Sequence, residues 1–118
     1  MSDLSELRGS EADEHTLPTV VREGTTIGAG ATIGPGIELG RFSMIGMGSV
    51  ITESVPDFHL RVGSPARTIA AVARNGQPLV RAVDAVLPDG HYRDDEGYGY
   101  QIAHNVVTET GRDQAPTS

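Results

Sequence analysis

Few side chains in this 118-residue chain could perform chemistry. Cysteine and lysine are both absent, which excludes thiol nucleophiles, disulfides, cysteine metal sites and a lysine Schiff base. The four histidines are spread along the chain. His15 stands directly before a repetitive segment and is a weak candidate for a general base. His59 is expected to be a loop residue, and His91 and His104 have no carboxylate or serine at a motif spacing.

A Gly-x-Gly motif at Gly28 and Gly30 suggests a nucleotide-binding loop. That loop requires a strand, a glycine-rich turn and then a helix. Here the motif returns at Gly34 and again at Gly46, and no helical pattern follows it. We therefore interpret these glycines as one structural turn that recurs.

A six-residue repeat accounts for the recurrence. From Val21 onward every sixth residue is aliphatic, and glycine follows it at four of the six positions. The aliphatic set is Val21, Ile27, Ile33, Leu39, Ile45 and Ile51. A period of six fits neither a helix nor a single strand, but it fits a short strand and a turn repeated. Three units then close a coil of 18 residues, which places Val21 beneath Leu39, Ile27 beneath Ile45 and Ile33 beneath Ile51. The sequence predicts an all-β fold, a short parallel β-helix.

Charge and composition narrow the class of protein. The formal net charge is -7 with no basic run, which disfavours nucleic-acid binding. No apolar run is long enough to span a membrane, and the acidic start does not resemble a signal peptide, so we expect a cytoplasmic protein. We expect a flexible acidic lead over 1–15, coils over 16–56, a C-terminal part over 57–108 and a disordered tail over 109–118.

A two-coil solenoid needs additional burial to be stable, because repeat proteins generally require three or more units. Met44 and Val50 occupy outward positions of the repeat although both are apolar. We expect them to form a subunit interface in a homo-oligomer.

The segment after the last coil carries a resemblance to a known family. The stretch Ile45–Thr52 reads IGMGSVIT, Val55-Pro56 follows, and Val62–Arg67 reads VGSPAR. Together they resemble the end of the hexapeptide-repeat acyltransferases, which form left-handed β-helices. The opening PTVVREGTTIGAGATI, from Pro18, is similar to sugar-nucleotide N-acetyltransferases. The resemblance covers about residues 18–81.

This resemblance implies an acetyl-CoA-dependent N-acetyltransferase that acts on a nucleotide-linked amino sugar or a small amine. Members are trimers that hold acetyl-CoA, the acyl donor, between neighbouring subunits, and no metal is implied. By position, the residues expected along the CoA path are Ala29, Gly30, Met47, Gly48, Pro65, Ala66 and Arg67.

Family members carry further coils before the stretch seen here, and those coils supply most of the acceptor pocket. The chain is thus interpreted as an N-terminally shortened member. Two alternatives stay open: a non-catalytic scaffold or regulatory subunit, and one half of a split enzyme whose partner chain supplies the N-terminal coils.

The C-terminal part shows alternating patterns near residues 78–86 and 98–107. They predict two strands joined as a hairpin that packs on the last coil. Related acetyltransferases can end in a zinc ribbon with cysteine pairs. Because this chain has no cysteine, we expect the hairpin to be metal-free.

Overall fold

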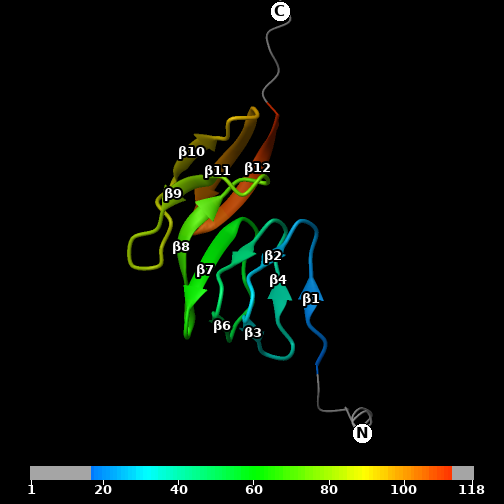
Figure 1. The fold of residues 1–118 in the computed structure, drawn as a ribbon. Coiled ribbons are helices and arrows are strands. Elements are labelled where there is room, and N and C mark those ends of the chain that lie inside the picture. The colour runs from blue at the N-terminus through cyan, green and yellow to red at the C-terminus, as the bar shows by residue number, and fades with distance from the viewer. Residues whose placement is uncertain (1–16, 113–118) are drawn as a thin grey trace, which may run out of the picture.

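The structure is a computed structural model that describes residues 17–112, and these residues form an all-β fold (Figure 1). Short strands of the coils lie at one end and a three-stranded antiparallel sheet lies at the other. The residues outside this range include His15, the expected lead over 1–15 and residues 113–118 of the expected tail. Within the described residues no helix is long and apolar enough to cross a membrane.

Six two-residue strands build the coils, and they pair in parallel with partners 18 positions apart, as the sequence predicts. The strands are β1 (Val20–Val21), β2 (Thr26–Ile27), β3 (Thr32–Ile33), β4 (Glu38–Leu39), β5 (Met44–Ile45) and β6 (Val50–Ile51). β1 pairs with β4, β2 with β5 and β3 with β6, one pair on each side of the coil. The predicted stacking of Val21 with Leu39, Ile27 with Ile45 and Ile33 with Ile51 is confirmed.

The aliphatic positions of the second coil form the core of the solenoid. Leu39, Ile45 and Ile51 are each at most 2% exposed. The equivalent positions of the first coil are far more open, with Val21 52% and Ile27 43% exposed, because no described residue covers that end of the stack. The same repeat position is therefore buried or exposed according to what lies beneath it.

Glycine serves two different purposes in the repeat. Glycines that follow the aliphatic residue allow close contact between coils: a β-carbon on Gly28 would lie 2.6 Å from the Met47 backbone nitrogen. Glycines two positions later adopt a left-handed backbone, such as Gly30 at φ 75° and Gly48 at φ 69°. Phe42 occupies this second position in its own unit and adopts φ 57° without being glycine.

Above the second coil the chain begins a third and then turns back. Val55 bridges to Leu39, and β7 (His59–Gly63) pairs in parallel with β5. β7 then turns into an antiparallel hairpin with β8 (Ala66–Val72), and β9 (Pro78–Arg81) adds to the far side of β8. The order β2-β5-β7-β8-β9 makes one sheet that runs from the coils into the C-terminal part.

The C-terminal sheet consists of β10 (Gly90–Arg93), β11 (Tyr98–Ala103) and β12 (Val106–Arg112), in that order. An antiparallel C-terminal element is as predicted, but the pairing of 78–86 with 98–107 is wrong. β9 pairs with β8, whereas β11 pairs with β10 on one side and with β12 on the other. The segment between the two predicted strands, residues 87–97, itself contains β10. β12 continues to residue 112, beyond the expected start of the tail at residue 109.

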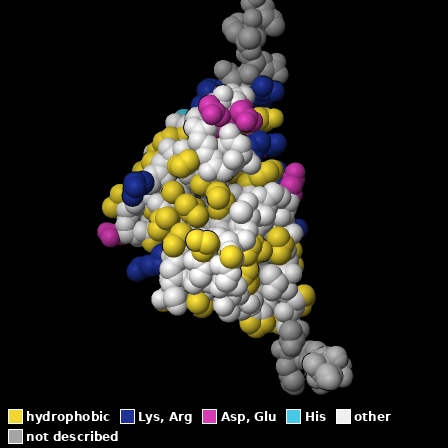
Figure 2. Space-filling model, in the orientation of Figure 1, with side chains coloured by type: hydrophobic (Ala, Val, Ile, Leu, Met, Phe, Trp, Pro, Cys, Tyr) yellow, Lys and Arg dark blue, Asp and Glu magenta, His cyan; other side chains and the backbone are white. Residues whose placement is uncertain are grey.

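An aromatic stack joins the coils to this sheet. The ring centroids of Phe42 and Phe58 are 5.6 Å apart, and Phe58 meets Tyr100 edge-on at 5.3 Å. Arg74 lies over both Phe42 and Tyr98 and makes two hydrogen bonds to Glu109, at 2.8 and 2.9 Å. In the face that Figure 2 shows, hydrophobic and uncharged side chains dominate over the coils, and acidic side chains gather near the C-terminal sheet.

Candidate functional site

Four of the residues expected along a CoA path form a column on one corner of the coils. We call Ala29, Gly30, Met47 and Gly48 the corner column. The Gly48 N–H donates to the Ala29 carbonyl at 2.9 Å, and a β-carbon on Gly30 would lie 3.9 Å from Gly48 Cα. The structure thus brings these four residues together, one coil directly above the other.

The corner column is open to solvent. Met47 is 77% exposed, and no atom lies within 4 Å of a β-carbon built on Gly48. The methionine side chain therefore extends outward. A slender ligand could lie against the glycine backbone on this corner, because no side chain of Gly30 or Gly48 keeps it away.

The turn that holds Pro65 continues the column. Val62 Cγ2 would meet a β-carbon on Gly46 at 2.8 Å, and the Gly63 N–H donates to Ser49 Oγ at 3.1 Å. The Ser64-Pro65 peptide bond at the tip of this turn is cis. The corner therefore extends from the first coil to the β7–β8 hairpin.

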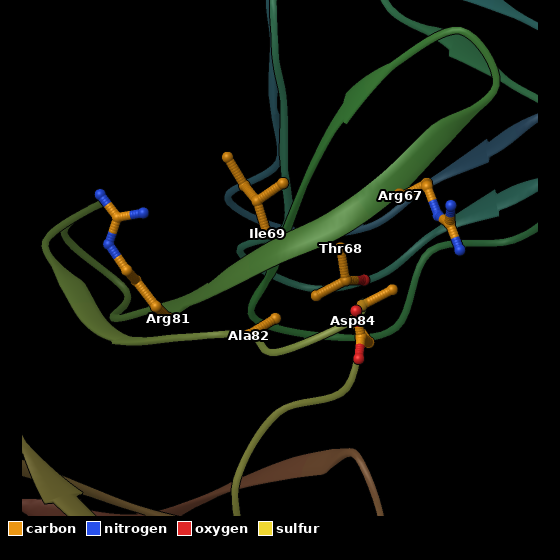
Figure 3. Close-up of a pocket in the computed structure, with 7 residues that line it drawn as sticks. Arg67, Thr68, Ile69, Arg81, Ala82 and Asp84 are labelled. Carbon is orange, nitrogen blue, oxygen red and sulfur yellow. The ribbon is translucent and has the colours of Figure 1, made fainter.

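Ala66 and Arg67 do not share this surface. Ala66 is partly buried against the core of the coils, and Arg67 follows it on the exposed side of β8. Arg67 borders a cleft of about 350 Å³ between β8 and the segment that follows β9 (Figure 3). We call this the arginine cleft; its lining residues are Arg67, Thr68, Ile69, Arg81, Ala82, Asp84 and Ala85. The expected site residues thus lie in three places: most on the corner, Ala66 against the core of the coils and Arg67 at the cleft.

A two-residue turn with an unusual backbone contributes to the lining of the cleft. Val83 and Val86 exchange backbone hydrogen bonds at 2.8 and 3.0 Å, and Asp84 and Ala85 between them have φ of 53° and 65°. Positive φ at both central residues is the requirement of a type I′ turn. Ala85 adopts it without the help of glycine or asparagine.

A buried hydrogen-bonded network lies beside the cleft and fixes the state of His59. His59 Nε2 donates to the Asn105 carbonyl at 2.9 Å, so its Nδ1 accepts from the Thr68 hydroxyl at 2.9 Å. The Thr68 oxygen accepts from Arg61 Nε at 3.0 Å, and Arg61 pairs with Glu53 at 3.2 Å. Burial lowers the pKa of His59 below its ordinary value. His59 lies in β7 and is fully buried, so it joins the coils to the C-terminal sheet and is not available as a base.

The other two described histidines, His91 and His104, do not build a catalytic group with the corner. His91 lies in β10 and His104 in the β11–β12 turn, and both are exposed. Within residues 17–112 no group of three or more His, Asp or Glu side chains is arranged to hold a metal ion.

The structure places Arg81, which the sequence analysis did not single out, in the lining of the arginine cleft. It lines the arginine cleft together with Arg67, although the two are 14 positions apart. The pairing of β8 with β9 brings it there, through the register of Ala70 with Arg81. No motif surrounds Arg81, and only the correct strand pairing could have identified it.

Comparison with known proteins agrees with this architecture. Residues 18–53 match the family model described as bacterial transferase hexapeptide (six repeats). The chain therefore carries a hexapeptide-repeat segment of the kind found in bacterial transferases over these residues. Its hexapeptide-repeat segment coincides with β1 to β6, whereas the arginine cleft lies outside the matched residues.

Relatives within the hexapeptide-repeat proteins include several acetyltransferases. The chain is 45% identical over 49 residues to a dTDP-3-amino-3,6-dideoxy-alpha-D-galactopyranose 3-N-acetyltransferase of Aneurinibacillus thermoaerophilus, covering 42% of this chain and 26% of that protein. A serine acetyltransferase of Brucella abortus, in complex with coenzyme A, is 42% identical over 47% of this chain and 22% of its own, with a TM-score of 0.46. A hexapeptide-repeat acetyltransferase of Vibrio cholerae, complexed with acetyl coenzyme A, is 28% identical over 58% of this chain and 38% of its own, with a TM-score of 0.48. The chain spans about a quarter of the length of the curated relative.

Proposed function

We propose that this chain binds acetyl-CoA along the corner column and takes part in transfer of the acetyl group to an amine. The acceptor class that fits best is an amino sugar linked to a nucleotide, because the curated relative acts on such a sugar. The observation that carries the proposal is the column itself, in which Gly30 and Gly48 stack one coil apart on an open corner.

The chemistry requires little from the protein beyond alignment. The acceptor nitrogen attacks the thioester carbonyl carbon, a C–N bond forms and the C–S bond breaks. The thiolate leaves and is protonated as the nitrogen loses its proton. Holding the two reactants in the productive geometry can lower the barrier by about 7–11 kcal/mol. Exposed backbone groups at the corner can position the amide-rich arm of CoA through hydrogen bonds.

We also propose that the active form is a homotrimer, because one chain offers only one wall for a ligand on a convex corner. The structure changes which apolar residues we expect at the subunit interface. Met44 is half-buried, and its sulfur lies 3.8 Å from a β-carbon built on Gly76, so the chain itself partly covers it. Val21 and Ile27 of the first coil are more exposed than Met44, as is Met47 of the second coil. Light scattering at micromolar concentration should give the mass of three chains, and a monomer would contradict this part of the proposal.

A thiol-release assay tests the activity. The chain has no cysteine, so a thiol reagent reports only the CoA released from acetyl-CoA. We expect release to depend on an added amine, with a nucleotide-linked amino sugar more effective than serine. Binding of acetyl-CoA without release would favour one half of a split enzyme, and no binding of acetyl-CoA would favour the non-catalytic scaffold.

A matched pair of variants tests the location. Gly48→Leu places a side chain on the corner, and Gly111→Leu places one on the C-terminal sheet; both glycines have positive φ and no atom within 4 Å of the new β-carbon. We expect Gly48→Leu to weaken acetyl-CoA binding at least tenfold and Gly111→Leu to leave it within twofold. Equal affinity in both variants would remove the corner from the proposal.

A further inference from the structure

Asn75 and Gly76 lie in the turn between β8 and β9, away from the corner column and outside the lining of the arginine cleft. The chain has two asparagines, Asn75 and Asn105, and only Asn75 is followed by glycine. Glycine has no side chain to shield its backbone nitrogen. That nitrogen can attack the side-chain amide carbon of the preceding asparagine, which is the route of spontaneous deamidation. Asn105 is followed by Val106, whose branched side chain crowds the corresponding nitrogen.

The turn holds the side-chain amide of Asn75 between two sets of partners. Its Oδ1 accepts from the Gln77 N–H at 2.9 Å, which polarises the amide carbonyl toward attack. Its Nδ2 donates to Asp95 Oδ1 at 3.2 Å and to Glu96 Oε2 at 3.4 Å, so it links the turn to the loop of residues 94–97. Asn75 is also exposed to the water that hydrolysis consumes.

We propose that Asn75 is a deamidation site and that its deamidation weakens the contact between the β8–β9 turn and the loop of residues 94–97. The Gly76 nitrogen bonds to Asn75 Cγ and the Cγ–Nδ2 bond breaks. Nδ2 leaves as ammonia and takes the proton that the Gly76 nitrogen loses. Water then opens the cyclic imide at either carbonyl, which leaves an aspartyl or isoaspartyl residue at position 75.

The folded turn controls when this reaction can occur. The Gly76 N–H donates to the Ala73 carbonyl at 2.9 Å, and Gly76 has a φ of 89°. The nitrogen must give up that hydrogen bond before it can attack Asn75 Cγ. Deamidation therefore proceeds through local opening of the turn, and denaturant should accelerate it.

The product brings a further negative charge to an acidic loop. A carboxylate at position 75 cannot donate to Asp95 or Glu96, and it repels both. The Asp95 N–H also donates to Gln77 Oε1 at 3.0 Å, across the same contact. We expect this bond to open more often after deamidation, which makes the Asp95 amide a reporter of the contact.

Mass spectrometry of the chain aged at mildly alkaline pH tests the site. Trypsin cuts after arginine, so Asn75 falls in the peptide Asn75–Arg81 and Asn105 falls in the peptide Asp94–Arg112 of the same digest. We expect Asn75 to deamidate at least tenfold faster than Asn105, and faster again in denaturant. Gly76→Ala should slow the reaction at least tenfold. Equal rates at the two asparagines, or no slowing in Gly76→Ala, would overturn the site, and a rate unchanged by denaturant would overturn its control by the turn.

Amide hydrogen exchange measured by NMR tests the consequence. Asn75→Asp supplies the charge without ageing, and Asn75→Ala removes the same hydrogen bonds without adding charge. We expect exchange of the Asp95 amide to be at least threefold faster in Asn75→Asp than in Asn75→Ala, with the difference reduced at high salt. Equal exchange in the two variants would overturn the effect of the charge. Neither experiment involves acetyl-CoA, so both results are independent of the function proposed above.

Discussion

Gly24 and Gly48 occupy the same position of the repeat with nearly the same backbone, at φ 74° and 69°, but they meet different surroundings. A β-carbon on Gly48 would meet nothing within 4 Å. A β-carbon on Gly24 would lie 2.3 Å and 2.4 Å from two carbons of the Phe42 ring. Alanine at either position is destabilised by the left-handed backbone. Only alanine at position 24 must also displace the Phe42 ring, which links the coils to the C-terminal sheet.

The shared cost is small. A left-handed backbone costs a non-glycine residue about 1–2 kcal/mol. Alanine recovers about 0.4–1 kcal/mol because it restricts the unfolded chain. Gly48→Ala should therefore lower the free energy of unfolding by about 1 kcal/mol. Gly24→Ala must also move the Phe42 ring, which adds about 1–3 kcal/mol of overpacking and about 0.5–1.5 kcal/mol of lost ring contact with Phe58.

Denaturant unfolding of the two variants, followed by circular dichroism, measures the difference. We expect Gly24→Ala to be less stable than Gly48→Ala by about 2–4 kcal/mol, with similar slopes against denaturant. Equal destabilisation would refute the reasoning, since it would mean that the Phe42 ring moves aside without cost and that the aromatic stack does not hold the two parts together.

Other perturbations have results that follow from single contacts. Ser43 Oγ is buried with no hydrogen-bond partner among the described residues, so Ser43→Ala should raise the free energy of unfolding by about 1 kcal/mol. Ser49→Ala should lower it by about 1–2 kcal/mol in the same denaturation assay, because it leaves the Gly63 N–H without its acceptor. Ala85→Gly should stabilise the chain by up to about 1 kcal/mol by removing left-handed strain; a loss of stability would contradict the strain. Burial lowers the pKa of His59, so the unfolded chain takes up a proton more readily than the folded one. Stability from this residue is complete above pH 6.5 and is lost as the pH falls below it, and the slope between pH 7.5 and 5 should be shallower in His59→Gln.

The coils could be predicted from the sequence because their signal is local and repeated. Each unit places an aliphatic residue such as Ile45 six positions after the last, and the 18-residue register follows from three sides to a coil. The sequence reveals the roles of the repeat glycines only in part. The pattern shows that Gly28 and Gly30 both recur, but only the structure separates close approach at the first from positive φ at the second.

The C-terminal part could not be predicted to the same extent because its pairing is not local. Residues 78–81 and 98–103 both alternate in polarity, yet each pairs with other strands. The error hid the arginine cleft, since Arg81 reaches it only through pairing with β8. The sequence likewise predicts His59 in a loop, whereas β7 forms through pairing with β5 and β8, with His59 opposite Ala71. Its side-chain partner Asn105 lies 46 positions away.

Whether acetyl-CoA binds along the corner column is tested most directly by an acetyl-CoA titration. The chain is labelled with 13C at its methionine methyl groups and followed by NMR. The chain has three methionines, of which the structure describes two. Met47 is exposed in the corner column, and Met44 is half-buried with its sulfur 3.8 Å from a β-carbon built on Gly76. Met47→Leu assigns its signal. Acetyl-CoA bound along the corner predicts a saturable shift of the Met47 methyl signal that exceeds any shift of Met44. A Met47 signal that stays in place at millimolar acetyl-CoA would contradict the account.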